Sequence, residues 1–253
     1  MTTATLLGAE PWSHIGRGSS GVLLIHGFTG SPSSMRGVAQ ACALAGFHVE
    51  LPRLSGHGTT VADLVPARWS DWSADAETAY QTLRQRCDRI VVIGLSMGGA
   101  LTLWLATHHP EIAGIVCINP VAQPLPDEMM SGLESLLRDG VESIPAIGSD
   151  IADPSAKEIS YDATPVRALH SLFADGVNNF VNLYPSVTVP MLLLNSVNDH
   201  VVDPKQSDYL VANYGGKIER VMLERSFHVA TQDFDKSIIF EKSIFFAREV
   251  TGS

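Results

Sequence analysis

The chain alternates short apolar runs with longer amphipathic stretches. The runs are rich in β-branched residues and end near Gly, Pro or Asn, which is typical of buried strands. They lie at Val22–His26, His48–Leu51, Ile90–Gly94, Gly114–Ile118, Met191–Asn195 and Ile218–Leu223. Helical periodicity is found at Ser33–Ala45, Trp69–Arg86, Met97–His108, Pro204–Asn213 and Asp233–Arg248. Continuously apolar strands that alternate with helices predict a doubly wound α/β fold, with a mostly parallel sheet covered on both faces.

The alternation stops between Gln123 and Ser186. This segment contains many Pro, Gly, Asp and Ser residues and two amphipathic patches, Leu133–Leu137 and Val166–Phe173, but no clear strand. We expect residues 123–186 to form a small cap subdomain inserted before the late strands. No internal repeat or low-complexity linker is visible, so we expect one domain over residues 1–253.

Composition narrows the possible partners and location. With 253 residues, 45% of them apolar, the chain can bury a large core, and its net charge of −10 disfavours nucleic acid as a partner. The cysteines Cys42, Cys87 and Cys117 lie far apart without metal-ligand spacing and are interpreted as reduced core thiols. The segment Met1–Trp12 lacks the pattern of a secretory signal, so we expect a cytoplasmic protein.

The longest uncharged stretch, Ile90 to Pro110, is long enough to suggest a membrane span. Its glycines, Gly94, Gly98 and Gly99, interrupt a single helix. A strand, the turn Gly94-Leu95-Ser96-Met97-Gly98 and a helix account for every residue, and this is the G-x-S-x-G nucleophile elbow in its strand–turn–helix setting. We therefore predict Ser96 as a nucleophile and the Met97 N–H as an oxyanion donor.

A serine nucleophile needs a histidine base and a carboxylate that orients it, in the chain order Ser, acid, His for this fold. Asp199 follows a late strand and is the predicted acid. Asp203 is the rival, but it directly precedes Pro204 and is typical of a helix cap. Among nine histidines, His228 alone lies between the last predicted strand and the final helix, so we predict it as the base.

The second oxyanion donor is expected in the loop after the first central strand, His26-Gly27-Phe28-Thr29-Gly30. The Phe28 N–H is the candidate, while His26 is expected to brace the loop. Gly56-His57-Gly58 is interpreted as a tight loop. The chain has no H-E-x-x-H motif, no Walker loop and no G-x-G-x-x-G after its first strand, so we expect no metal and no cofactor.

Taken together, these motifs resemble the α/β-hydrolase superfamily and, more narrowly, the bacterial monoacylglycerol lipases and related small carboxylesterases. The motifs are His26–Gly30, Gly56–Gly58, Gly94–Gly99, Asn198–Val202 and Ser226–His228. The resemblance extends from Gly8 to the last helix, but Pro124–Pro145 matches no family motif, which leaves the acyl-chain preference open.

The resemblance implies a serine hydrolase that releases fatty acid and glycerol from monoacylglycerols, with Ser96, Asp199 and His228 as the triad and Phe28 and Met97 as oxyanion donors. It also implies that a cap glutamate, Glu158, contacts the glycerol, although a solvated charge is the alternative. Two other functions stay open: a carboxylesterase for short-chain or specialised metabolite esters, and an inactive binding module. The amphipathic cap segments indicate at most transient contact with lipid surfaces, and the oligomeric state is left open.

Overall fold

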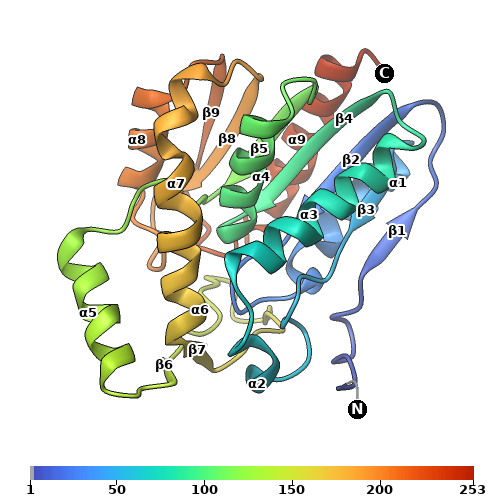
Figure 1. The fold of residues 1–253 in the computed structure, drawn as a ribbon. Coiled ribbons are helices and arrows are strands. Elements are labelled where there is room, and N and C mark those ends of the chain that lie inside the picture. The colour runs from blue at the N-terminus through green and yellow to red at the C-terminus, as the bar shows by residue number, and fades with distance from the viewer. Residues whose placement is uncertain (1–2) are drawn as a thin grey trace.

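A computed structural model describes residues 3–253. Met1 and Thr2, which belong to the expected domain and to the segment Met1–Trp12, lie outside the described residues. In the described chain, seven strands form one sheet in the order β1-β3-β2-β4-β5-β8-β9 (Figure 1). The strands are β1 (Trp12–His14), β2 (Ser20–Ile25), β3 (His48–Leu51), β4 (Arg89–Leu95), β5 (Gly114–Ile118), β8 (Met191–Ser196) and β9 (Ile218–Leu223). Only β1 runs antiparallel to its neighbour, β3, and this confirms the predicted mostly parallel sheet.

Helices cover both faces of this sheet, as the apolar strands require. They are α1 (Arg36–Leu44), α3 (Trp69–Arg84), α4 (Met97–His108), α8 (Lys205–Asn213) and α9 (Lys236–Thr251), whereas the short helix α2 (Val61–Leu64) contacts residues 163–165. Side chains alternate along a strand, so Leu23 and Ile25 pack with the core beneath α3 and α4, whereas Val22 and Leu24 pack with the core beneath α1 and α9. In Figure 1, α3 and α4 lie in front of the sheet and α9 behind it.

The predicted strands agree with the structure to within two residues at each end, but other elements differ. The edge strand β1 was not predicted because it has three residues and no buried alternation. The helix expected from Ser33 begins as a 3₁₀ turn, Pro32–Met35 (η1), before α1. The last helix starts at Lys236 rather than Asp233, whose carboxylate binds loop amides instead.

Residues 123–186 contain helices and one small strand pair. The elements are α5 (Asp127–Arg138), β6 (Ser143–Pro145), β7 (Ala163–Pro165), α6 (Val166–Ser171), the π-helix η2 (Leu172–Val177), α7 (Asn178–Phe180) and the 3₁₀ helix η3 (Val181–Ser186). The expectation of no strand here was wrong, because β6 and β7 are three-residue strands, each ending in proline, that form an antiparallel pair. In Figure 1, α5 stands away from the main sheet.

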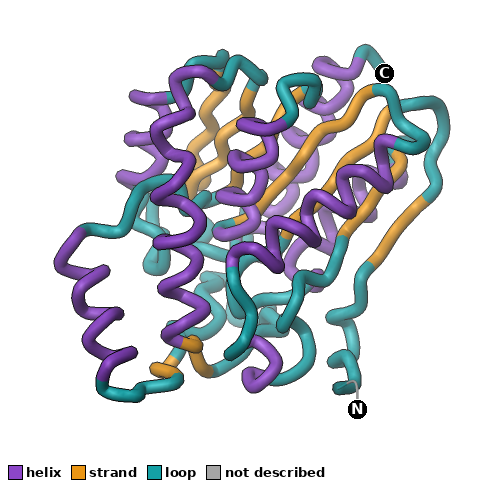
Figure 2. The backbone as a smooth tube through the Cα atoms, in the orientation of Figure 1, coloured by secondary structure: helices purple, strands orange, loops and turns teal. Residues whose placement is uncertain are grey.

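The stretch from Ile90 to Pro110 folds as most of β4, a tight turn and α4, and residues 90–103 are all buried. Its lack of charge is therefore explained by burial inside the protein. No helix within residues 3–253 has the length and apolar character needed to cross a membrane. The loops that follow the parallel strands gather at the lower end of the sheet in Figure 2, where parallel α/β folds carry their sites.

Candidate active site

Ser96 stands at the sharp turn between β4 and α4. Its backbone has φ 58° and ψ −118°, a conformation that L residues rarely adopt and that marks stored strain. The neighbouring glycines are required by space: a Cβ on Gly94 would collide with the Gly98 carbonyl, and a Cβ on Gly98 with the Ile25 carbonyl. The elbow therefore closes only when both positions lack side chains.

The turn is fastened by backbone hydrogen bonds. The Ser96 N–H donates to the Ile118 carbonyl at 3.0 Å, and the Ser96 carbonyl accepts from Val121 N–H at 3.1 Å. These bonds tie the elbow to the end of the neighbouring strand β5. The Ser96 side chain is consequently held at the carboxyl edge of the central strands.

Asp199 and His228 meet at this same edge. Asp199 follows β8 and His228 follows β9, and Nδ1 of His228 lies 2.7 Å from Oδ2 of Asp199. The other carboxylate oxygen, Oδ1, accepts hydrogen bonds from the N–H groups of Val201 and Val202, each at 2.8 Å. Both side chains are almost fully buried, so the pair is shielded from water and the carboxylate has a fixed orientation.

The backbone of His228 is held as firmly as its ring. Asn119, at the end of β5, donates from Nδ2 to the His228 carbonyl at 2.8 Å and accepts at Oδ1 from Ser196 N–H at 2.7 Å. Asp150 accepts from the His228 N–H at 3.0 Å. Sequence reasoning missed both residues, although a buried strand that ends in an asparagine followed by Pro120 is a signal that could have indicated the first.

The loop after β2 lies beside the elbow. A Cβ on Gly27 would come 3.3 Å from the Ser96 Cβ, so this loop passes directly against the nucleophile candidate. The Phe28 ring packs edge-on against Trp72, with centroids 5.6 Å apart. Within residues 3–253, neither Phe28 N–H nor Met97 N–H donates a hydrogen bond to another group of the chain, as an oxyanion donor requires.

Ser96 and His228 approach from different loops without a hydrogen bond between their side chains in the described chain. Such bonds in serine hydrolases are often long and tighten when substrate is bound. The structure thus brings Asp199 and His228 into direct contact. The elbow of Ser96 is bonded to Ile118, whose neighbour Asn119 binds the His228 carbonyl.

Glu158 lies across the loop after β2. A Cβ on Gly30 would come 2.7 Å from Glu158 Oε1, so the carboxyl group is close to the loop that carries Phe28. Burial raises the pKa of Glu158 to about 7, and the nearby His228 acts in the opposite direction by favouring the charged form. Glu158 is thus a partly buried carboxyl group beside this loop.

The remaining candidates lie elsewhere or serve the loops. Asp203 accepts from Lys205 N–H at 2.9 Å and stands one residue before Pro204, the N-cap of α8. His26 Nε2 accepts from Leu54 N–H at 3.2 Å, and burial lowers the pKa of His26 to about 4, so a neutral ring braces the loop. His57 is fully buried between two glycines with positive φ.

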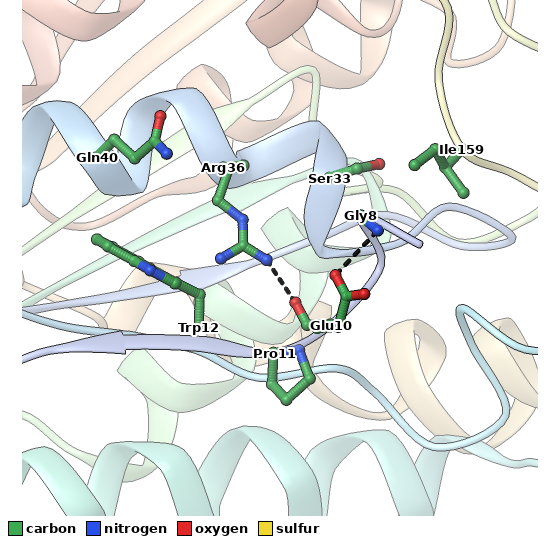
Figure 3. Close-up of a pocket in the computed structure, with 8 residues that line it drawn as sticks. All are labelled: Gly8, Glu10, Pro11, Trp12, Ser33, Arg36, Gln40 and Ile159. Carbon is green, nitrogen blue, oxygen red and sulfur yellow. Dashed lines mark hydrogen bonds between the residues drawn. The ribbon is translucent and has the colours of Figure 1, made fainter. Parts of the chain in front are cut away.

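No group of three or more His, Cys, Asp or Glu side chains in residues 3–253 is arranged to hold a metal ion. Cys42, Cys87 and Cys117 are buried and unpaired, and burial raises the pKa of each thiol. A shallow hollow of about 500 Å³ is lined by Arg36, Trp12 and Ile159 among others (Figure 3). None of the predicted catalytic residues lines this hollow.

The chain is similar to known lipases and esterases. The chain is 44% identical over 246 residues to a thermostable monoacylglycerol lipase of Bacillus sp. strain H-257, and the match covers 96% of each protein. It is 26% identical over 234 residues to a carboxylesterase of Bacillus subtilis strain 168, covering 88% of this chain and 90% of that one.

A solved structure reported for LipS and LipT, two metagenome-derived lipolytic enzymes, superimposes with a TM-score of 0.91 at 42% identity. It covers 97% of this chain and 100% of that chain. The family model described as "Serine aminopeptidase, S33" matches residues 18–235. This match spans the elbow, the Asp199–His228 pair and the segment between them, so the chain belongs to this family of α/β-hydrolases.

Proposed function

We propose that the protein is a serine hydrolase that cleaves carboxylic esters, with Ser96 as the nucleophile, His228 as the base and Asp199 as the acid. The observation that carries the proposal is the 2.7 Å contact between His228 Nδ1 and Asp199 at the sheet edge where Ser96 has its strained backbone. A contact at Nδ1 leaves Nε2 to take the proton of the Ser96 hydroxyl.

In the first half of the reaction, Ser96 Oγ attacks the ester carbonyl while His228 Nε2 accepts its proton. The carbonyl oxygen gains negative charge, which the unpaired N–H groups of Phe28 and Met97 and the positive end of α4 stabilise. His228 then donates its proton to the leaving alcohol, and the acyl group remains on Ser96. Asp199 keeps the imidazole in the required tautomer and stabilises its charged form.

In the second half, His228 takes a proton from water, and the resulting hydroxide adds to the acyl carbonyl. The same two N–H groups hold the second oxyanion. Collapse of this intermediate returns the proton from His228 to Ser96 Oγ and releases the carboxylic acid. The groups that stabilise the charge of the oxyanion are both backbone N–H groups, so the site needs no side-chain donor for the oxyanion.

We propose monoacylglycerols as the substrate class. The support is the 44% identity to the thermostable monoacylglycerol lipase over nearly the whole of both chains. The partly buried Glu158, beside the loop that carries Phe28, provides a hydrogen-bonding group for glycerol hydroxyls near the leaving alcohol. In this role the Glu158 carboxyl group would form hydrogen bonds to the substrate.

We further propose that residues 123–186 act as the cap of a single domain and that this cap touches lipid surfaces transiently in a cytoplasmic enzyme. Its apolar side chains at Met129 and Ile147 are 57% and 67% exposed, so they face solvent instead of lining an internal channel for the acyl chain. Loss of liposome co-sedimentation in a Met129→Ser, Ile147→Ser double variant is the expected result, and no binding by the parent protein would contradict the surface role. Fractionation of the native host tests the location.

The alternative substrate class is short-chain esters, which the identity to the carboxylesterase supports. Rates on a chain-length series of monoacylglycerols, compared with short soluble esters, distinguish the two. We expect the highest kcat/KM on a monoacylglycerol, and a clear preference for short esters would refute that class. A fluorophosphonate probe should label Ser96 but not a Ser96→Ala variant, whereas an unlabelled parent protein would favour an inactive binding module.

A further inference from the structure

The segment of the insertion just before Glu158 is bonded to both loops that carry the predicted acid and base. Asp150 Oδ2 accepts from the His228 N–H at 3.0 Å and from the His200 N–H, next to Asp199, at 3.2 Å. Its second oxygen, Oδ1, lies 2.9 Å from His200 Nδ1, and its own carbonyl accepts from Val229 N–H at 3.0 Å. One carboxylate thus joins the loop after β8 to the loop after β9.

The connection is reciprocal, because Asp233 makes the opposite bonds. This fully buried carboxylate, in the chain just after the His228 loop, accepts from Ala152 N–H at 2.7 Å and from Asp153 N–H at 3.0 Å. It also accepts from Phe227 N–H at 2.9 Å. Each of the two segments therefore supplies a carboxylate to backbone amides of the other, and such charge-assisted bonds are stronger than bonds between neutral groups.

The far end of the same segment is bonded to the loop that carries Phe28. Tyr161 N–H donates to the Thr29 carbonyl at 3.0 Å, and the Ser31 hydroxyl donates to the Ile159 carbonyl at 2.9 Å. Residues 148–161, which we name the strap, therefore run from the His228 loop to the oxyanion loop. Three loops that are far apart in the sequence are held by one short piece of chain.

We propose that Asp150 is a positioning residue for the hydrolytic reaction. Its carboxylate accepts hydrogen bonds from the backbone N–H groups of His228 and His200, and so holds the base next to the acid. The inference rests on the proposed function. Asp199 aligns the ring of His228, but a ring can swing as a whole when its backbone shifts. A misplacement of about 1 Å between reacting groups can reduce a rate by roughly 10²-fold, so the backbone contact matters to the chemistry.

Two substitutions at Asp150 distinguish the position of the acceptor oxygen from its negative charge. Asparagine keeps one oxygen at the distance that the two amides require but lacks the negative charge. Glutamate keeps the charge but moves the oxygens by one methylene group. If Asp150 acts by accepting these two amides, Asp150→Asn should retain activity and Asp150→Glu should lose it. Asp150→Ala should lose it as well, since no acceptor remains.

The experiment measures kcat and KM on a short soluble ester, together with hydrogen exchange of the amides at 227–229. We expect Asp150→Ala and Asp150→Glu to lower kcat by roughly 10-fold to 10²-fold with KM changed less than about 3-fold. Exchange at 227–229 should accelerate in both variants. Asp150→Asn should stay within about 3-fold of the parent kcat, with protected amides.

Asp153→Ala is the matched control, because Asp153 lies on the same strap but its carboxylate, among the described residues, accepts hydrogen bonds only from Ser155 of its own turn. It should leave kcat and exchange unchanged. Unchanged kcat in a folded Asp150→Glu protein, or loss of activity in Asp150→Asn with retention in Asp150→Glu, would overturn the proposal. Ser96→Ala is measured in the same assay. If Ser96→Ala is inactive while all Asp150 variants are fully active, only the positioning role of Asp150 is wrong. If Ser96→Ala is active, the proposed function itself is wrong.

Discussion

Nδ1 of His228 lies 2.7 Å from Oδ2 of Asp199, although 29 positions separate them in the chain. Their burial means that neither group exchanges this partner for water at low cost, and two backbone amides hold the other carboxylate oxygen. This contact fixes the orientation of the His228 imidazole and leaves Nε2 to accept the proton of Ser96 in the proposed reaction. It is the basis of the first prediction.

We expect Ser96→Ala and Asp199→Asn each to lower kcat by roughly 10³-fold or more on a monoacylglycerol, because one removes the attacking oxygen and the other favours the wrong imidazole tautomer. Asp203→Asn is the control, since Asp203 bonds Lys205 at the start of α8, and its kcat should remain within a few-fold. Steady-state kinetics on purified variants with intact thermal transitions provide the measurement. Comparable losses for Asp199→Asn and Asp203→Asn would contradict the assignment of the acid.

The elbow glycines should tolerate no side chain. Gly94→Ala would place a methyl group on the Gly98 carbonyl in α4, and Gly98→Ala would place one on the Ile25 carbonyl in β2, so we expect each to lower the free energy of unfolding by about 3 kcal/mol or to prevent folding. Gly132→Ala is the matched control, because a Cβ there meets no atom within 4 Å and lies on helix α5. It should gain about 0.5 to 1 kcal/mol. Urea unfolding separates the two, and a stable Gly98→Ala protein would be inconsistent with the observed packing.

Acid should destabilise the protein through its buried histidines. Burial lowers the pKa of His26 to about 4 and that of His57 well below its usual value of 6.5, so the folded state keeps both rings neutral. The unfolded chain binds protons at both sites once the pH falls below 6.5, and the stability that these neutral rings provide at higher pH is then lost. We expect His26 to lower the free energy of unfolding by roughly 1 kcal/mol per pH unit between pH 6.5 and 4, and His57 to act in the same direction.

Urea unfolding at a series of pH values tests this, with substitution of the exposed His14 by Gln as a control that should leave the slope unchanged. This measurement is made in a protein whose Glu158 has been replaced. If its free energy of unfolding stays constant from pH 7 to pH 5, the prediction for the buried histidines is wrong. That background is needed because Glu158 acts in the opposite direction.

Glu158 has a pKa raised from 4.5 to about 7, so the folded state retains a proton that the unfolded chain releases. Stability therefore decreases as the pH rises from 4.5 to 7. Glu158→Gln removes this dependence, and we expect the variant to gain up to about 3 kcal/mol over the parent across that range. Glu241→Gln, at an exposed position of α9, is the control for loss of a surface carboxylate.

The same Glu158 variant tests the glycerol contact. If the carboxyl group binds the leaving alcohol, Glu158→Gln should raise KM for a monoacylglycerol by several-fold and leave the KM for a simple alkyl ester unchanged. Equal effects on both substrates would indicate a structural residue without glycerol specificity.

The central strands and the elbow could be predicted because their signals are local. β4 is a buried apolar run, and the glycines around Ser96 stand in a five-residue motif of the chain, although the collision that requires Gly98 is with the distant Ile25 carbonyl. Asp199 and His228 could be placed because the order of strands in a parallel sheet brings their loops to one edge. The strand β1 and the pair β6–β7 were missed, since three residues are too short for a periodic pattern.

The amino-acid sequence determined the alternating core, the elbow and the residue types of the predicted triad, because each depends on hydrophobic periodicity or on steric demands between close neighbours. Only the tertiary structure decided which groups hold the triad in place. Asn119 and Asp150 act on His228 across 109 and 78 positions, and each does so through backbone amides or carbonyls. Every residue carries these backbone groups, so no sequence pattern marks which of them a distant side chain will bind.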